Sequence, residues 1–588
     1  MLGTLRDAVF SKLPRSIFSL SLLCLSLSLG LIYITPEGPN KAYLSNIRQL
    51  ALLTLIISGS LTYSDFRKHG RNNLFKKIEL PKFSDSIYLL IPLTPIINYI
   101  VLNRELLLII DTVYVLALTI FAVLLLGALS ILISITGSFR VLMIFSLVFL
   151  FTIFNTSTIL ANKGEGIGSL TIIQSFYIVS MSTLLIVFDR INKRYSYILA
   201  IAFFLLTTLS QTYSQYTKNA SEKNVQVMQR NIKTDLKNNI ITETPNMYIL
   251  VYESYGNEET IGYYGFDNSK QMNYLVNVGF KVVHGCYSIG SASLDSMTKV
   301  LDISNVSSNL PSYTSGNATG LNYLKELGYK TVAVFSSLYF FTGQPINSLR
   351  WDLYYPDRTR TGWAGVVLFN SILEGIFRHN AFENYLGNYE EYVSTKRQHL
   401  TNLKNFSPAL FYTHNSHPGH TQNSGVCLPE EKDKFFDNLR RANDEMQGDL
   451  NTILRNDPNS IIFVVGDHGP YLTKNCFNLS AEIRDSIDKI DIQDRNGTLM
   501  AVYWPENINH RSDFELMIIQ DIFPSILAFL ANDLSLFDKL KMPRVSNSGA
   551  TGGVYIDNGV LVGGVNDGEP LFNRRSYKLN NPAVELQN

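Results

Sequence analysis

The chain has little charge of either sign. Its 588 residues carry 50 Lys and Arg against 49 Asp and Glu, a net charge of +1, and charged residues make up 17% of the chain against 46% for apolar residues. Because the positive and negative charges are nearly equal in number, the chain has no global field that would attract a polyanion. This argues against nucleic acid as a partner. The sequence also has no evident internal repeat or low-complexity tract, and its length suggests about three domains.

Apolar residues are concentrated in the first 213 residues, and most of the charge follows them. Seven apolar stretches can be marked, at about 17–35, 48–64, 86–102, 106–135, 141–161, 168–188 and 196–213. Several reach the roughly 20 residues that a helix needs to cross a bilayer. We therefore expect an α-helical membrane domain of about seven spans over residues 1–213. The third stretch is short and contains Pro92 and Pro95, so five spans is the alternative count.

Basic residues in the loops between these stretches predict the orientation of the membrane domain. They occur at the N-terminus, in the loop at 65–85 and in two later turns: Arg6, Lys12, Arg15, Arg67, Lys68, Arg71, Lys76, Lys77, Lys82, Arg140, Arg190, Lys193 and Arg194. With the N-terminus inside, all of them lie on the cytoplasmic side, as the positive-inside rule requires. The opposite turns, near Arg104-Glu105 and Lys163-Glu165, are nearly neutral. Five spans and seven spans both place the C-terminal half outside.

Two features adjoin or interrupt the apolar stretches. Asp111 lies in the fourth stretch, where a carboxylate either serves a function or sits near the interface. A transporter with an appended domain would need several such residues, and Asp111 is the one obvious case. Residues 214–245 are polar with helical spacing, which indicates either an amphipathic linker along the membrane surface or a solvated connecting helix.

The chain contains four cysteines. Cys24 lies in an apolar stretch, whereas Cys286, Cys427 and Cys476 fall in the half predicted to be external, where disulfides can persist. Three thiols cannot all pair. The favoured pair is Cys427 with Cys476, and the alternative is that all three are free thiols.

From residue 246 onward the pattern changes to an alternation of strands and helices. Apolar strands are predicted at Met247–Tyr252, Thr331–Phe335, Ala409–Tyr412, Ile461–Val465 and Leu499–Tyr503. Helical patterns lie between them, for example at Leu321–Leu327 and Lys432–Leu454. Continuous apolar strands separated by helices predict a mostly parallel sheet covered on both faces, here an α/β domain over 246–540. The remainder, 541–588, contains a hairpin-like Ile556–Gly559 and is interpreted as a terminal extension packed on this domain.

Acidic residues follow two of the predicted strands. Glu253 ends the first strand, and Asp467-His468 comes directly after a later one. Ligands of a parallel sheet gather at the carboxyl ends of its strands, and a rigid sheet fixes the separation of side chains there. An acid at a strand end is more often a helix cap or part of a solvated turn, but carboxylates and an imidazole together are typical metal ligands. With the Ser-rich turn around Ser293, the set predicts a one-metal phosphoryl or sulfuryl transfer site.

Over about residues 246–535 the chain resembles the sulfatase-like branch of the alkaline phosphatase superfamily. Nearest in layout are the membrane-anchored phosphoethanolamine transferases and the lipoteichoic-acid-synthase type phosphoglycerol transferases. The motifs that carry the resemblance are Glu253-Ser254, Gly290–Ser296, His417 within His414–Gly419, Gly466–Gly469 and Asp521–Pro524. The Cys/Ser-x-Pro-x-Arg motif of sulfatases proper is absent, which disfavours sulfate ester hydrolysis.

The resemblance implies a set of site residues. Ser293 takes the place of the family's usual Thr nucleophile, with Ser291 and Ser296 as the alternatives in register. One divalent ion is implied, Zn or Mn first and Mg as a possibility, with these ligands: Glu253, Ser293, Asp467 and His468.

Three histidines follow the third predicted strand of the α/β half. His417 is expected to bind the phosphate or to protonate a leaving oxygen, and His414 is assigned to substrate binding beside it. Two other interpretations remain for His414, His417 and His420: a second metal site, or histidines on the surface of a Pro/Gly loop.

The implied activity is transfer of a phospholipid head group, phosphoethanolamine or phosphoglycerol, through a phospho-Ser intermediate. Its acceptor would be an envelope glycan or a lipid A-like glycolipid, and the protein would be a monomer in the bacterial inner membrane with its catalytic domain on the periplasmic or extracellular side. The spacing Ser293-x-Asp295-Ser296 resembles the phosphoglycerol branch. The phosphoethanolamine branch typically has a cysteine on each side of its nucleophile, whereas here Cys286 precedes Ser293 and no cysteine follows it in the same turn. Both donors therefore stay open. The alternatives are a phosphodiesterase or sulfatase-type hydrolase, or an inactive protein of envelope assembly.

Overall fold

The computed structural model describes most residues from 244 to 575, with gaps at 305–311, 342–348, 357–388, 421–429, 474–478, 480–481, 509–511 and 548, and only scattered residues between 48 and 206. The chain divides into two compact units. One comprises residues 1–223 with 362–382, and the other comprises 224–361 with 383–588.

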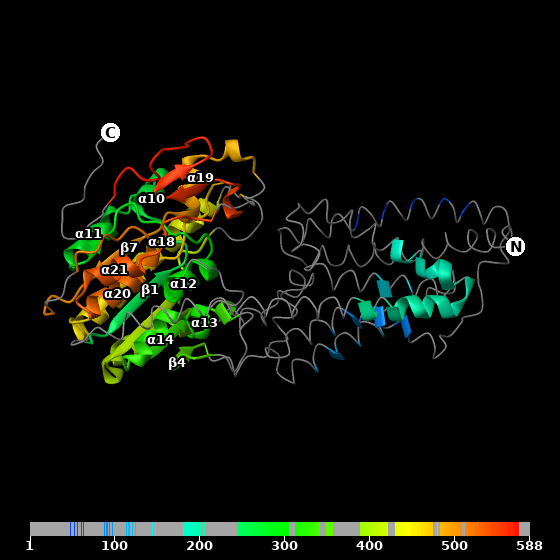
Figure 1. The fold of residues 1–588 in the computed structure, drawn as a ribbon, viewed down its shortest axis with the longest axis horizontal. Helices are drawn as coiled ribbons and strands as arrows, with labels where there is room; N and C mark the ends of the chain where they lie inside the picture. The colour runs from blue at the N-terminus through cyan, green and yellow to red at the C-terminus, as the bar shows by residue number, and fades with distance from the viewer. Residues whose placement is uncertain are drawn as a thin grey trace. The chain divides into compact units, whose positions relative to one another are not determined.

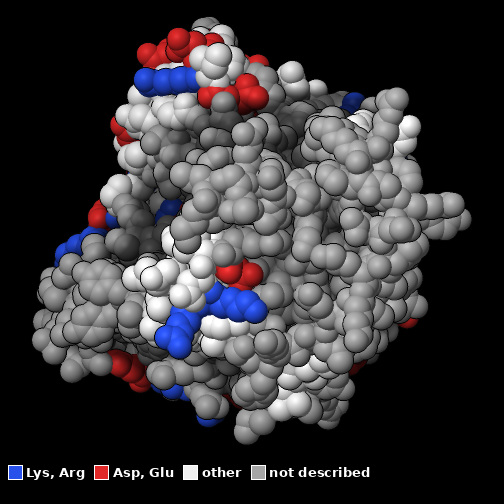
Figure 2. Space-filling model, turned by 90° about the vertical axis from the view of Figure 1, so that its right-hand side faces the viewer, with Lys and Arg blue, Asp and Glu red and all other residues white. Residues whose placement is uncertain are grey.

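In the first unit, the described residues are mainly helical. A buried apolar cluster joins Tyr88, Ile91, Ile144, Leu147, Val148, Leu185, Ile186 and Ala200. The hydroxyl of Tyr88 donates to Asp189 Oδ1 at 3.0 Å and also contacts Ser196. In the middle of the face drawn in Figure 2, basic side chains lie beside acidic ones.

The membrane predictions concern residues that are mostly not described. Among the described residues, no helix has the length and apolar character to cross a membrane. The basic loop at 65–85, Asp111 and Cys24 lie outside the described residues, as does almost all of the linker 214–245. The seven-span interpretation therefore stays a prediction.

The second unit is built around a seven-stranded sheet, counted over its described residues (Figure 1). From one edge to the other its strands are β2 (Lys281–Val282), β7 (Met500–Tyr503), β6 (Ile461–Gly466), β1 (Met247–Tyr252), β5 (Ala409–Asn415), β3 (Lys330–Phe335) and β4 (Leu353–Tyr355). The pairings among β6, β1, β5, β3 and β4 are parallel, whereas β7 pairs antiparallel with both β6 and β2. The carboxyl ends of β1, β5 and β6 therefore lie side by side.

Helices are interleaved with the strands. The α-helices described in this unit are α10 (Glu258–Tyr263), α11 (Ser269–Asn277), α12 (Ser293–Asp302), α13 (Ser312–Ser315), α14 (Thr319–Glu326), α17 (Tyr389–Asn402), α18 (Glu431–Asn456), α19 (Lys489–Asn496), α20 (Ile522–Leu530) and α21 (Leu534–Leu540). Short 3-10 helices are η4 (Leu338–Phe341), η8 (Leu403–Phe406), η11 (Arg484–Ser486), η12 (Ile519–Asp521) and η13 (Gly549–Thr551). This alternation confirms the predicted α/β class.

Apolar periodicity explains how α18 packs on the sheet. Its buried apolar residues recur every three or four positions and so form one face: Phe435, Leu439, Ala442, Met446, Leu450 and Ile453. That face shares a core with Tyr248, Leu250 and Tyr252, which are alternate residues of β1 and so point to the same side of the sheet. All six residues of β1 are buried, so both faces of the central strand are covered.

The predicted strands all occur, with small shifts at their ends. β1 has the predicted bounds, β6 is one residue longer, and β5 runs three residues past its predicted end to Asn415. The hairpin in the C-terminal residues is also present, as β8 (Tyr555–Asp557) paired with β9 (Val560–Val562). Its Ile556 and Leu561 share a core with Tyr287, so residues after 541 support the segment that leads to Ser293.

Candidate active site

Glu253 is held where β1 ends. Its backbone N–H donates to Asn415 O at 3.0 Å, and its carbonyl oxygen accepts from Gly419 N at 2.9 Å. Ser254 then turns the chain with a φ of 59°, in the left-handed region that residues other than Gly rarely adopt, and its N–H donates to Asp467 Oδ1 at 2.8 Å. The ends of β1 and β6 are thereby joined directly, with both carboxylates beside the same turn.

The two oxygens of Asp467 have different surroundings. Oδ1 accepts from the N–H groups of Ser254, at 2.8 Å, and His468, at 2.9 Å. Oδ2 is buried and has no hydrogen-bond partner, and it lies 3.5 Å from Nε2 of both His414 and His468. A buried carboxylate oxygen without a hydrogen bond needs a positive charge nearby, which either the two imidazoles or a divalent cation held between these groups could supply.

Ser293 occupies the first position of α12. Its Oγ lies 2.9 and 3.1 Å from the two carboxylate oxygens of Glu253 and 3.3 Å from His468 Nε2. Gly290 permits the tight turn before the helix, because a Cβ there would come within 2.5 Å of Ser296 Cα. We refer to Glu253, Asp467, His414 and His468 as the carboxylate cluster. The hydroxyl predicted to be the nucleophile thus lies against this cluster and at a helix N-terminus, where backbone N–H groups favour an anion.

The neighbouring serines have structural contacts instead. Ser296 is fully buried, and its Oγ donates to the carbonyl oxygen of Asp467 at 2.7 Å and contacts Ser288 Oγ at 2.5 Å. The carbonyl oxygen of Ser291 accepts a hydrogen bond from Tyr471. Of Ser291, Ser293 and Ser296, it is Ser293 whose hydroxyl lies against Glu253.

His468 presents one ring nitrogen to the cluster. Its Nδ1 lies 2.9 Å from the carbonyl oxygen of Gly469, which can only accept, so Nδ1 carries the proton of the neutral ring. Nε2 lies 3.3 Å from Glu253 Oε1, and in the neutral ring it is the nitrogen that would offer a lone pair to a cation. The ring stacks on Tyr471 with centroids 4.7 Å apart. A ring oriented in this way is typical of a metal ligand.

The other three predicted histidines separate in space. His414 is fully buried, with Nε2 3.0 Å from Glu253 Oε2, and His420 Nε2 lies 3.7 Å from Glu253 Oε1. His417 instead packs edge-on against Tyr389, with ring centroids 4.3 Å apart, and its Nδ1 is buried without a hydrogen-bond partner. The structure therefore brings His414 and His420 to the carboxylates and turns His417 toward α17, an arrangement that sequence spacing could not predict.

Opposite charges dominate the electrostatics of the cluster. Burial alone would raise the pKa of Glu253, but hydrogen bonds from His414 and His468 hold it well below its ordinary value. Burial opposes protonation of His414, yet Asp467 and Glu253 raise the pKa of this imidazole to about 9. The pKa of His468 is raised by the same carboxylates, again against the effect of burial. Without a metal, protons on the imidazoles balance the carboxylates, and a divalent cation would displace them.

The donor atoms fit a divalent ion. Two overlapping sets of close donors are present among the described residues, Glu253 with His420 and His468, and Glu253 with His414 and Asp467. Carboxylate, imidazole and hydroxyl donors suit zinc or manganese, whereas magnesium prefers oxygen ligands alone. The unpaired Asp467 Oδ2 is the observation in this structure that such an ion would satisfy.

The cysteine predictions are only partly within the described residues. Cys427 and Cys476, the favoured disulfide pair, lie outside them. Cys286 is a buried free thiol whose pKa is raised well above its ordinary value by burial and then by Asp521.

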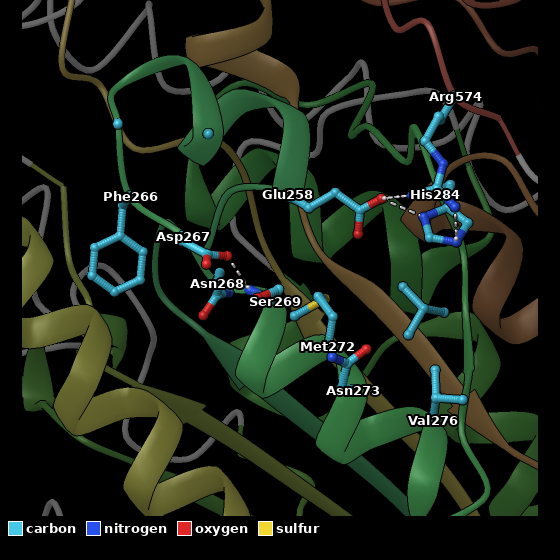
Figure 3. Close-up of a pocket in the computed structure, with 13 residues that line it drawn as sticks. Glu258, Phe266, Asp267, Asn268, Ser269, Met272, Asn273, Val276, His284 and Arg574 are labelled. Carbon is cyan, nitrogen blue, oxygen red and sulfur yellow. Dashed lines mark hydrogen bonds and ion pairs between the residues drawn. The ribbon is translucent and has the colours of Figure 1, made fainter.

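A separate pocket lies beside α10 and α11, with a cavity volume of about 680 Å³ (Figure 3). At one end Glu258 contacts His284 and lies 3.6 Å from an Arg574 nitrogen. At the other end Asp267 accepts from the Ser269 N–H at 2.9 Å. The charged groups at this pocket therefore pair with one another or with the backbone.

No protein-family model and no curated protein sequence matches the chain. Solved structures do. The C-terminal periplasmic domain of EptC from Escherichia coli is 15% identical with a TM-score of 0.36, over 54% of this chain and 94% of that one. Lipoteichoic acid synthase LtaP from Listeria monocytogenes is 15% identical with a TM-score of 0.35, over 61% and 92%.

A third match covers more of the chain. Lipooligosaccharide phosphoethanolamine transferase A, an integral membrane protein from Neisseria meningitidis, is 12% identical with a TM-score of 0.33, over 77% of this chain and 97% of that one. Because the identities are low, the function proposed below rests on the site itself.

Proposed function

We propose that this protein is a metal-dependent phosphotransferase. It would move a phospholipid head group, phosphoethanolamine or phosphoglycerol, onto an envelope glycan or glycolipid through a phospho-Ser293 intermediate. The observation that carries the proposal is the position of Ser293 Oγ, 2.9 Å from Glu253 Oε1, in the cluster that also holds the unpaired Asp467 Oδ2. A hydroxyl nucleophile, hard anionic ligands and an anion-binding helix start are the parts that phosphoryl transfer needs.

The ion would be held by Glu253, Asp467 and His468 and would lower the pKa of a hydroxyl bound to it. Ser293 Oγ passes its proton to Glu253, whose carboxylate oxygens lie 2.9 and 3.1 Å away, and forms a bond to the phosphorus of the phospholipid. The bond from phosphorus to the diacylglycerol oxygen breaks, and the head group stays on Ser293. The N–H groups at the start of α12 face the extra negative charge as it develops.

The leaving diacylglycerol oxygen must gain a proton. His420 is the better placed donor, because its Nε2 lies 3.7 Å from Glu253 Oε1 and its side chain is one-quarter exposed. His417, the residue favoured from sequence, packs against Tyr389 instead. In the second step an acceptor hydroxyl passes its proton to His420, which gave one up in the first step, and bonds to phosphorus. Ser293 Oγ then leaves the phosphorus and takes back its proton from Glu253.

The lipid donor and the external acceptor follow from the predicted membrane segments. An enzyme anchored in the bilayer meets phospholipid at high local concentration, and the basic loops place residues after 246 outside. The geometry of the cluster applies equally to a phosphoethanolamine or a phosphoglycerol diester, so both donors remain within the proposal.

The proposal is tested by mass spectrometry of envelope lipids and glycans from cells that carry the wild-type protein or the Ser293→Ala variant. The wild type should add one head-group mass to a glycan or glycolipid and increase diacylglycerol, and the variant should do neither. Free phosphoethanolamine or glycerol phosphate without a modified acceptor would show a hydrolase instead. Identical profiles for both proteins would contradict transfer and favour the inactive assembly protein.

A further inference from the structure

The carboxylate cluster contains an imidazole that its strand-end motifs do not require. We propose that His414 is an additional ligand of the divalent ion and biases the site toward zinc-type ions over magnesium. The inference rests on the proposed function only in that both need a bound ion at Glu253 and Asp467. It replaces the sequence-based assignment of His414 to substrate binding.

The positions of the donor atoms carry the proposal. His414 Nε2 lies 3.0 Å from Glu253 Oε2 and 3.5 Å from Asp467 Oδ2, and His468 Nε2 lies 3.3 Å from Glu253 Oε1 and 3.5 Å from the same Asp467 Oδ2. Ligands that bind one ion at about 2.0–2.2 Å lie about 3 Å from one another. The two imidazoles therefore stand in the same relation to the carboxylates, and one of them is already expected to bind the ion.

The orientation of the His414 ring is fixed by its neighbours, as is usual for a histidine that binds a metal. The residue is fully buried, and its backbone is paired with Val251 of β1 and Phe335 of β3. The ring packs against Phe340 with centroids 4.3 Å apart, and Nδ1 lies 3.4 Å from the Tyr412 hydroxyl. A partner on the second ring nitrogen is the usual support of a ligating histidine. Because the His414 ring is fully buried, it does not face the solvent from which the substrate must enter, and this favours metal binding over substrate binding.

A second imidazole changes which ions the site favours. Magnesium prefers an all-oxygen shell, whereas zinc and manganese accept imidazole nitrogen readily. With His414 the protein would supply two imidazoles, two carboxylates and the Ser293 hydroxyl. The competing interpretation makes His414 an imidazolium that only neutralises Glu253 and Asp467. The two interpretations predict opposite effects of removing the ring, because losing a positive charge would strengthen cation binding.

The experiment measures ion binding rather than turnover. The purified full-length protein is stripped with a chelator and titrated calorimetrically with ZnCl₂, MnCl₂ and MgCl₂ alone. His414→Gln should weaken zinc binding about tenfold or more, with a smaller change for magnesium. His284→Gln, the same change at an imidazole outside the cluster, should leave zinc affinity unchanged. Zinc binding that is equal or tighter in His414→Gln would overturn the proposal.

A second variant covers the case in which His414→Gln does not fold. His414→Cys offers a thiolate, which also binds zinc, so it should retain zinc affinity. With Co²⁺ in place of zinc, it should add a sulfur-to-metal charge-transfer band in the near ultraviolet. Absence of that band in a folded, cobalt-loaded protein would contradict ligation at this position. Ion binding that follows these expectations without head-group transfer would remove the proposed function and leave the role of His414 intact.

Discussion

Ser293 and Ser296 lie three positions apart at the start of α12, yet they meet different groups. The first faces the carboxylate of Glu253, and the second faces the backbone of Asp467 and the hydroxyl of Ser288. The difference follows from helical geometry at the helix start, where Ser293 is the first residue and Ser296 already lies against the core. Both residues offer the same hydroxyl group, so their positions alone decide that Ser293 faces Glu253 and Ser296 faces the core.

Ser293→Ala should abolish covalent labelling by a phospholipid with a labelled head group, while folding and ion binding persist. Ser293→Thr should keep part of the activity, because the hydroxyl is retained. Ser296→Ala should instead cost about 1–3 kcal/mol of stability, since it leaves buried partners unsatisfied. Peptide mapping locates the label, and a labelled peptide in Ser293→Ala, at Ser291 or Ser296, would show that the register is wrong.

Asp467→Asn should remove most of the bound metal. The change places an amide N–H₂ or a neutral oxygen where Oδ2 now lies unpaired, so the ion loses an anionic ligand. Glu253→Gln and His468→Ala should act similarly, because each removes one donor of the same cluster. Metal content by plasma mass spectrometry is the measurement.

The matched control is Asp457→Asn, because Asp457 lies just after α18 and accepts from Asn246 and Tyr248 at the opposite end of the strands. That variant should keep its metal. Full occupancy in the Asp467, Glu253 and His468 variants would mean that the ion binds elsewhere.

At the scale of elements, α17 and α18 enclose a buried charge network beside the site. Lys396 of α17 contacts Glu445 and lies 2.5 Å from Asp449 Oδ2, both on α18. Glu445 accepts in turn from Asn415 at 2.7 Å, and Asn415 accepts from the His417 N–H at 2.9 Å. Burial alone would raise the pKa of Glu445, but the Lys396 ammonium holds it below its ordinary value. The loop after β5 is thus tied to both helices.

Lys396→Met should destabilise the protein by about 3–5 kcal/mol, because it leaves two buried carboxylates without their cation. Lys404→Met, at an exposed position close in sequence, should change stability by less than about 0.5 kcal/mol. Urea denaturation followed by tryptophan fluorescence measures both. Equal stability of the two variants would show that the network contributes little.

At the scale of the whole molecule, the predicted topology separates the basic loops from the site. In a variant without native cysteines, Gly70→Cys should stay unlabelled by a membrane-impermeant thiol reagent in intact spheroplasts and react after lysis. Lys404→Cys, exposed in the α/β unit, should react in both conditions. The positive-inside rule is the reason for the expectation. Labelling of residue 70 before lysis would reject this orientation.

The α/β class, the position of the central strands and the carboxylates at their ends can all be predicted from the amino-acid sequence. These features are local, because a run such as Met247–Tyr252 is apolar at every position and stops at Glu253. The meeting of Glu253 and Asp467 was also predictable, since the carboxyl ends of adjacent parallel strands share one edge of the sheet. Ser293 was chosen from the family resemblance, and in the structure its hydroxyl lies 2.9 Å from Glu253 Oε1.

The positions of the histidines relative to the carboxylates, by contrast, depend on long-range contacts. From sequence, β5 was predicted to end at Tyr412, which left His414 in a loop with His417 and His420. In the structure the ladder with β1 continues through the pair Val251–His414 to Asn415, so His414 is a strand residue with a fixed direction toward the carboxylates. Strand length here depends on hydrogen bonds to a partner 163 residues away in sequence. No local sequence pattern predicts this pairing. The pairing is what distinguishes His414, a buried candidate ligand, from His417 and His420 in the loop after β5.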